Sequence, residues 1–295
     1  MTPQDLLLEV FCLVDDELTA LGLTDLRSRG PDPRLHDSEV ITIELVGELL
    51  GFDRDARLFW FFRRYHAAEF PQLPRVHRTT FARQAANLWR AKQLLQRRLA
   101  ERLAGPAADW LVDSMPVPVC RYGRGGYCKG FRGQADYGYD PVQQQTYYGF
   151  RLHLRTSRQG VILAYELAPA NAADAALVPE LAPPPGTAGI GDRNYWSPEL
   201  AADLAASGVR LLAPYQTRKH DPDPARSRRL SGPRWRVETV NGQLADRYRA
   251  KRVWARDLWH LCHRVIRKAL SHTVAVCLSV TAGLPPLRFA DLLAA

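Results

Sequence analysis

Cysteine, methionine and lysine are all scarce in this chain of 295 residues. Cysteine occurs five times, and an odd number of scattered thiols excludes a disulfide-rich framework and indicates a reducing compartment. No stretch is long and apolar enough for a membrane-spanning helix, because the least polar one, residues 269–284, contains Ser271, His272 and Thr273. Residues 1–16 hold four acidic and no basic side chains, which argues against a signal peptide. We therefore expect a soluble cytoplasmic protein with no membrane partner.

The scarcity of lysine makes arginine the main basic residue. Only five of the 40 basic side chains are lysine, and the formal net charge is +9. Arginine binds phosphate and carboxylate oxygens with two parallel N–H groups, so the bias favours contact with a polyanion, although a GC-rich coding sequence produces the same bias. The charge is local, because residues 218–268 carry 15 Lys and Arg but only 5 Asp and Glu. This local excess indicates a DNA-binding surface rather than a solvated helix face.

The hydrophobic period changes near residue 106 and predicts two domains. Residues 1–105 have apolar side chains at helical spacing and are expected to form an all-helical N-terminal domain. Residues 106–295 are expected to form an α/β domain, in which helices stack on a mixed sheet. Its predicted elements are a strand at 110–113 ended by Pro116 and Pro118, a hairpin of 148–155 and 161–167, strands at 187–192 and 209–214, and helices at 198–207 and 235–280.

Three acidic residues stand at positions suited to catalysis. Asp113 lies in the first predicted strand, Asp192 ends a later strand, and Glu238 lies early on the long helix. Each has a structural alternative: Asp113 can cap a turn, Asp192 can cap a helix, and Glu238 can be a solvated residue paired with Arg234. An ionised carboxylate among apolar residues is costly to bury unless a cation meets it. Three converging carboxylates therefore favour a divalent metal, and oxygen-only ligands select Mg²⁺ or Mn²⁺.

Short stretches around these acids add to the pattern. They are Val112-Asp113-Ser114, Tyr148-Gly149-Phe150-Arg151-Leu152-His153, Pro169-Ala170-Asn171 with Asp174, and Gly191-Asp192 before Tyr195. Together with the order of the three acids, they resemble the Asp-Asp-Glu (DDE) transposases of bacterial insertion sequences over residues 110–279. The resemblance implies an RNase H-like catalytic domain, a mixed sheet flanked by helices, with the acids on its first strand, after its fourth strand and on a helix beyond its fifth.

The resemblance also implies a function. It implies a transposase that cleaves DNA at the terminal inverted repeats of its insertion sequence and joins the ends to target DNA. Asp113, Asp192 and Glu238 would be the catalytic residues and would hold two Mg²⁺ or Mn²⁺ ions. The implied partners are double-stranded DNA and a second copy of the chain, in a nucleoid-associated homodimer. Two alternatives stay open: an RNase H-like nuclease without strand transfer, and a DNA-binding protein that has lost catalysis.

One departure from the family pattern follows Glu238. Many relatives carry an Arg four residues before the Glu and a Lys seven residues after it. Arg234 matches the first position, but Ala245 occupies the second. Arg249 lies eleven residues after Glu238, which on a continuous helix returns to nearly the same face, so it is a candidate replacement. The departure puts activity in question, but not the fold.

The candidate DNA-binding residues form three groups. The first group, beside Glu238, is Arg234, Arg236, Arg249 and Lys251. The second group, after Asp113, is Arg121, Arg124 and Lys129. The third group, in the N-terminal domain, is Arg78 and Arg83. Arg78 and Arg83 belong to a helix predicted over residues 78–103. Two interpretations of this N-terminal domain are equally good: a helix-turn-helix that reads DNA, and a helical domain for dimerisation or packing.

Overall fold

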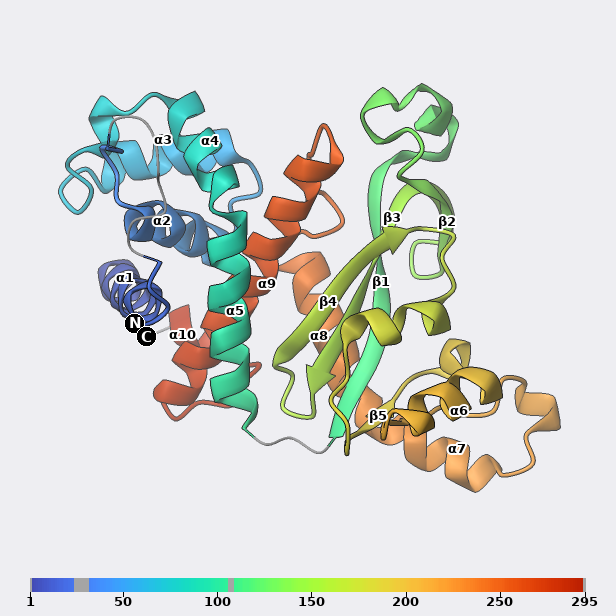
Figure 1. Cartoon of the computed structure of the whole chain (residues 1–295). Helices are drawn as coiled ribbons and strands as arrows, with labels where there is room; N and C mark the ends of the chain where they lie inside the picture. Colours follow the sequence, from blue (N-terminus) through green and yellow to red (C-terminus); the bar gives the residue numbers. More distant parts are fainter. Residues whose placement is uncertain (1, 24–31, 106–108, 294–295) are drawn as a thin grey trace. The chain divides into compact units, whose positions relative to one another are not determined.

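The computed structural model describes residues 2–23, 32–105 and 109–293, which divide into two compact units (Figure 1). The helical unit contains Met1–Leu99, Asp246–Ala255 and Trp259–Ala295, and the sheet unit contains Ala100–Ala245 and Arg256–Leu258. The predicted domain boundary at residue 105 borders residues 106–108, which lie outside the described residues, and stays a prediction. The units differ from it because most of the chain after Ala245 clusters with the N-terminal helices and not with the sheet.

The helical unit is an assembly of helices from both ends of the chain. They are α1 (Pro3–Ala20), α2 (Asp37–Leu49), α3 (Asp55–Tyr65), α4 (Arg78–Asn87), α5 (Trp89–Ala104), α9 (Leu258–Thr281) and α10 (Phe289–Leu293), with the last residues of α5 and the first of α9 counted in the sheet unit. α1 begins with a capping box in which Thr2 and Asp5 exchange hydrogen bonds. Among the described residues, no helix has the length and apolar character needed to cross a membrane.

A buried network of ion pairs holds α2, α5 and α9 together. On α2, Glu44 accepts hydrogen bonds from Lys92 of α5 at 2.7 Å and from Arg267 of α9 at 3.0 Å. Glu48 lies one turn later and accepts from Arg267 at 2.7 Å and from Lys268 at 2.9 Å. All five side chains are buried. Such charges must all be paired, because an unpaired charge in a protein interior is strongly destabilising.

The helix predicted over residues 235–280 is two helices, α8 (Trp235–Asp246) in the sheet unit and α9 in the helical unit. Between them, Arg249 and Trp254 adopt left-handed backbone conformations, with φ of 51° and 55°. A right-handed helix cannot continue through such residues. The prediction of one long helix is therefore wrong. The helical spacing that related Arg249 to Glu238 is also wrong, because α8 ends before Arg249.

The sheet unit is built on a six-stranded mixed sheet. Its elements are β1 (Asp109–Arg121), β2 (Asp136–Asp140), β3 (Gln145–Ser157), β4 (Ile162–Pro169), β5 (Ala188–Ile190), α6 (Pro198–Ala206), β6 (Arg210–Leu212), α7 (Pro224–Ser231) and α8. The strand order is β2-β3-β1-β5-β6, and β4 also pairs with β3 as the predicted hairpin. β1 is antiparallel to β3 and parallel to β5. This arrangement confirms the predicted fold class, a mixed α/β sheet with flanking helices that is consistent with an RNase H-like domain.

β1 is much longer than the sequence pattern predicts. It continues through Pro116 and Pro118, which pair with Arg151 and Gly149 of β3. Proline lacks an N–H group and is tolerated in a strand where that group has no partner to lose. β5 pairs only with the start of β1, Asp109–Leu111. Within the described residues, the rest of β1 on the side of β5 therefore pairs with no other strand. The prediction that the two prolines end the strand is therefore wrong.

Successive residues of β1 face opposite layers of the sheet unit. Leu111 packs in a cluster with Val237 of α8, whereas Val112 packs in a cluster with Leu204 of α6. Because side chains alternate along a strand, Asp113 points to the same side as Leu111. The alternation of β1 therefore directs Asp113 toward α8, the helix that carries Glu238.

Candidate active site

Asp113 is held between its own strand and α8. Its Oδ2 accepts a hydrogen bond at 3.0 Å from the side-chain amide of Asn241, which lies on α8. Its Oδ1 accepts a hydrogen bond at 2.9 Å from the backbone N–H of Ser114. The side-chain amide of Asn241 thus fixes the carboxylate from the helix, although the sequence analysis gave this residue no role. Its position three residues after Glu238, on the same helix, was the available signal.

Asp192 is placed beside Asp113 by the register of two parallel strands. β1 and β5 pair Leu111 with Ile190, and each acid lies two residues beyond one of these partners. Neighbouring strands are about 4.8 Å apart, and parallel strands end at the same edge of a sheet. Asp113 and Asp192 therefore occupy adjacent positions at the carboxyl end of the β5 ladder.

The loop that carries Asp192 is closely packed. A Cβ atom on Gly191 would lie 2.7 Å from the side chain of Tyr195, so no other residue fits without a shift. Asp192 Oδ1 accepts a hydrogen bond at 2.9 Å from the N–H of Asn194 and caps a short 3₁₀ turn. Helix α6 is instead capped by Ser197. The alternative in which Asp192 caps the helix is therefore wrong, since Asp192 caps only the turn that directly follows it.

Glu238 is the most exposed of the three acids. Its side chain is 55% exposed, and its Oε1 lies 3.4 Å from Nη2 of Arg234, one helical turn earlier. This contact is the surface ion pair that the sequence left open as the structural alternative for Glu238. The Arg234 side chain is only 15% exposed, so Glu238 is the partner that can leave this pair more easily.

The three acids act on one another electrostatically. Burial raises the pKa of Asp113 to about 6, and the charges of Asp192 and Glu238 add to the rise, while the guanidinium of Arg234 opposes it. Burial also raises the pKa of Asp192, again against the influence of Arg234. Arg234 is therefore the positive charge that lies near all three carboxylates.

The acids suit a hard divalent cation by their chemistry, although they do not form a closed cage. No group of three or more Asp, Glu, His or Cys side chains is close enough to hold a metal ion in residues 2–23, 32–105 and 109–293. Asp113 and Asp192 offer only oxygen atoms as metal ligands, and the buried amide oxygen of Asn241 has no hydrogen-bond partner. Oxygen donors fit Mg²⁺ or Mn²⁺, so the fit is good for two acids, and Glu238 would complete it after leaving Arg234.

A fourth carboxylate, Asp174, ties the two aspartate positions together. Asp174 is buried and accepts hydrogen bonds from the hydroxyl of Ser114 at 2.8 Å and from the side-chain amide of Asn194 at 3.3 Å. Ser114 follows Asp113 directly, and Asn194 lies two residues after Asp192. The sequence places Asp174 shortly after Pro169-Ala170-Asn171, one of the stretches that resemble the family. It predicts none of these contacts, because only the fold brings the three segments together.

Arg151 and His153 of β3 complete the surroundings of Asp174. Arg151 Nε and His153 Nδ1 each lie 3.7 Å from Asp174 Oδ1. His153 is fully buried, and burial lowers its pKa to about 4 in spite of the neighbouring carboxylate. The alternating sequence of this strand is typical of a half-exposed strand, but the side that carries His153 is covered as well.

The candidate DNA-binding residues are divided between the two units. Arg234 and Arg236 are in the sheet unit, where Arg236 lies 4.0 Å from the ring of Trp235. The same unit carries three exposed basic residues, Arg121 at the end of β1 and Arg124 and Lys129 after it. The helical unit carries the exposed pair of α4, Arg78 and Arg83, together with Arg249 and Lys251.

Two corrections concern the basic segment 218–268. Arg249 is not on the helix of Glu238, and its side chain lies 3.5 Å from Asp53 within the helical unit. Arg249 is therefore no longer a candidate to replace the family lysine, whose position is occupied by Ala245. Arg267 and Lys268 are buried in the ion-pair network, so part of the local positive charge is neutralised inside the protein.

Comparison with known proteins gives one match. A family model described as a transposase DDE domain matches residues 106–255, which is just over half of the chain and includes Asp113, Asp192 and Glu238. Neither the curated proteins nor the solved structures contain a match.

Proposed function

Because this chain belongs to the family of transposase DDE domains, we propose that it cleaves DNA at the terminal inverted repeats of an insertion sequence and joins the ends to target DNA. The observation that supports the proposal is the register of β1 and β5, because its last pair, Leu111 with Ile190, comes two residues before Asp113 and Asp192. Asp113 and Asp192 are both partly buried and both have raised pKa values, so a divalent metal ion beside them would stabilise their ionised forms.

Asp113 and Asp192 would hold one divalent ion, and Glu238 with one of them a second. When bound, such ions supply the positive charge that stabilises an attacked phosphodiester group and its leaving 3′ oxygen. The chain's own part is positional. Asn241 and the Ser114 N–H orient the Asp113 carboxylate, and the Asn194 N–H orients Asp192.

In this proposal Arg234 binds either Glu238 or a DNA phosphate. In the chain alone it lies near all three acids and pairs with Glu238. If metal ions were held by the acids they would balance the carboxylate charges, and Arg234 would then be able to donate two parallel N–H groups to a DNA phosphate. Arg236, Arg121, Arg124 and Lys129 lie in the same unit and would extend this contact along double-stranded DNA. Joining two ends requires two active sites, which favours a homodimer.

The test is cleavage and joining of DNA that carries the element ends, in Mg²⁺ or Mn²⁺. We expect Asp113→Asn, Asp192→Asn and Glu238→Gln each to lower the rate at least about a hundredfold while DNA binding persists. Glu199→Gln, at an exposed position on α6, is the matched control and should leave the rate unchanged. Undiminished cleavage by any of the three site variants would remove that residue from the assignment.

A second candidate function, DNA binding without catalysis, has two observations in its favour. Ala245 stands where the family carries a lysine, and Glu238 does not join the other acids in a metal-binding group within the described residues. Tight binding to end-containing DNA with no cleavage in Mn²⁺ would establish this function instead. Nicked products without joined ends would indicate a nuclease that lacks strand transfer.

A further inference from the structure

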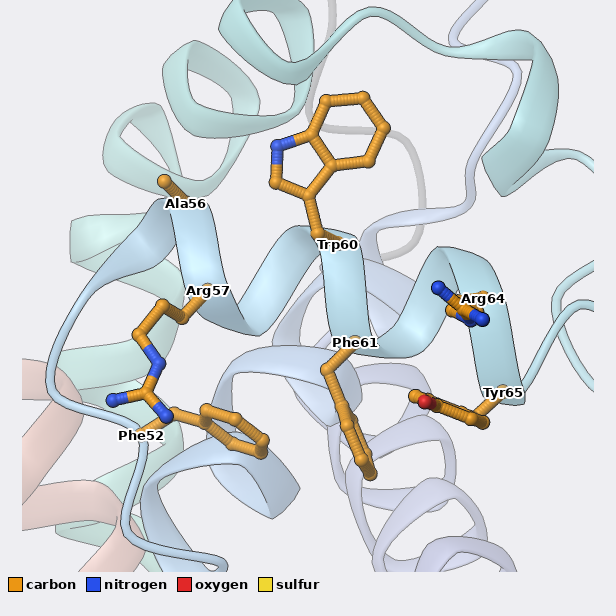
Figure 2. A pocket seen from close by; sticks show the side chains of 7 residues that line it. All are labelled: Phe52, Ala56, Arg57, Trp60, Phe61, Arg64 and Tyr65. Atoms are coloured by element: carbon orange, nitrogen blue, oxygen red, sulfur yellow. The ribbon is translucent and has the colours of Figure 1, made fainter.

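Helix α3 of the helical unit presents an open hollow lined by aromatic and arginine side chains. The hollow has a volume of about 380 Å³. Its lining, shown in Figure 2, consists of Phe52, Ala56, Arg57, Trp60, Phe61, Arg64 and Tyr65. We call these residues, with Arg54 and Arg63, the α3 surface. Two rows of side chains four residues apart produce it, because residues at this spacing are neighbours on one side of a helix.

The rings of the α3 surface are unusually exposed. Trp60 is 55% exposed and Tyr65 is 64% exposed, whereas the neighbouring Phe59 and Phe62 are buried in the core. Phe61 lies between the exposed and buried layers, 5.3 Å from the ring of Tyr65. The core of this unit therefore does not account for Trp60 and Tyr65, and exposed aromatic surface of this kind marks a binding site.

The arginines of the α3 surface lie close to these rings and lack acidic partners. Arg63 lies 5.2 Å from the Trp60 ring, and Arg64 lies 5.6 Å from the Tyr65 ring. Within the part of the chain that the structure describes, no carboxylate forms an ion pair with Arg54, Arg57, Arg63 or Arg64. The two nearest acids in sequence pair elsewhere, Asp53 with Arg249 and Asp55 with Arg267.

We propose that the α3 surface binds an unpaired stretch of DNA, with nucleobases stacked on Trp60 and Tyr65 and phosphates held by the arginines. Open aromatic faces beside positive charge are the combination by which proteins bind single strands without reading their sequence. Bases inside a duplex already stack on one another and offer no free face to these rings. A second copy of the chain is a poorer occupant, because a symmetric interface would bring the unpaired arginines of both copies together.

The binding itself does not depend on the proposed catalysis. Its place in the reaction, holding an unpaired strand near a cleaved or opened DNA end, rests on the proposed function. Binding is therefore measured without divalent metal, in EDTA, so that the catalytic acids have no part in the result. A loss of cleavage in Asp113→Asn and a loss of strand binding at the α3 surface are then separate outcomes.

The experiment compares a labelled short single strand with a blunt duplex, by fluorescence anisotropy of the full-length protein. We expect Trp60→Ala and Tyr65→Ala each to weaken single-strand binding at least about fivefold, since one stacked base contributes roughly that much or more. Trp60→Phe keeps an aromatic face and should retain most of the affinity. Trp89→Ala, at an exposed tryptophan on α5, is the matched control and should change nothing.

Two results would overturn the proposal. One is unchanged single-strand affinity in Trp60→Ala and Tyr65→Ala, with both variants folded as judged by circular dichroism. The other is an equal loss for Trp60→Ala and Trp60→Phe, since this would show that the aromatic face is not what binds. If Trp60→Ala instead converts a dimer to a monomer in light scattering with strand affinity unchanged, the α3 surface is an interface between copies of the chain.

Discussion

At the scale of single residues, the central feature of this protein is a carboxylate whose charge is poorly tolerated. Asp113 has a pKa of about 6 because it is buried, although two hydrogen bonds and the charge of Arg234 favour its ionised form. The unfavourable ionisation is what a divalent cation would relieve. A carboxyl pKa raised in this way is typical of functional sites, which supports the proposed role of Asp113.

The raised pKa of Asp113 gives a prediction on stability. Its usual value is 3.8, so between pH 4 and pH 6 the folded chain binds a proton that the unfolded chain has released, and stability falls as the pH rises through this range. Asp113→Asn has no such charge. In metal-free buffer we expect the variant to be more stable than the parent by about 3 kcal/mol well above pH 6, with the difference vanishing toward pH 4.

Urea unfolding followed by tryptophan fluorescence, at several pH values in EDTA, measures this difference. Asp223→Asn, at an exposed position, should show no comparable change with pH, because asparagine caps a helix about as well as aspartate. A stability difference that is the same at pH 5 and pH 8 would contradict the burial of an ionised Asp113.

How much of the site the sequence reveals also depends on the residue. The hydrophobic flanks of Asp113 and Asp192 predict the two strands to which these acids belong, and the register of β1 and β5 brings the two segments together, although Asp113 lies within β1 and not at its end. Asn241 and Asp174 were missed because their roles come from contacts across long sequence distances. Arg249 was misplaced because helical spacing was extended beyond the point where α8 ends.

At the scale of secondary structure, alternation and helical periodicity predict elements well but not their ends. The β3–β4 hairpin follows from two alternating runs around Gly160. The length of β1 cannot be predicted in this way. A strand can continue through Pro116 and Pro118 only where no neighbouring strand needs their N–H groups, and the sequence does not show which edge of β1 has a neighbour. The break between α8 and α9 is also hidden, since Arg249 and Trp254 are residues that rarely take the left-handed conformation they have here.

The ion-pair network between α2, α5 and α9 carries a prediction at this scale. Glu48→Gln removes a charge that pairs with both Arg267 and Lys268, and it leaves two buried cations with too few carboxylates. We expect the helical unit to lose about 3–5 kcal/mol of unfolding free energy, as measured by urea denaturation. Glu9→Gln, on the exposed side of α1, is the control and should change stability by less than about 0.5 kcal/mol.

If Glu48→Gln lowers the unfolding free energy as little as Glu9→Gln does, the ion-pair network is not closed to solvent. The double variant Glu48→Gln with Lys268→Met separates the two causes of a large loss. Removing one cation together with the carboxylate should restore part of the stability, because fewer charges then remain unpaired.

At the scale of the whole molecule, the partition of the chain was the hardest feature to predict. Composition and period place a change near residue 106, but they carry no sign that the chain after Ala245 rejoins the N-terminal helices. That return depends on Arg267 and Lys268 meeting Glu44 and Glu48, more than 200 residues away in the sequence. As a result, the basic segment 218–268 is not one surface, since parts of it lie in each unit and two of its cations are buried.

The salt dependence of DNA binding tests where the remaining positive charge acts. Each phosphate contact that is lost should reduce the slope of log affinity against log salt concentration by about 0.9 for duplex DNA. We expect the triple variant of Arg121, Arg124 and Lys129 to Gln to lower the slope by about 2–3, because all three side chains are exposed in the sheet unit beyond Asp113. Arg158→Gln is the control, since Arg158 already pairs with Asp109 at 2.9 Å. An unchanged slope in the triple variant would show that duplex DNA does not contact this end of β1, and would leave Arg234 and Arg236 of the sheet unit and Arg78 and Arg83 of α4 as candidates.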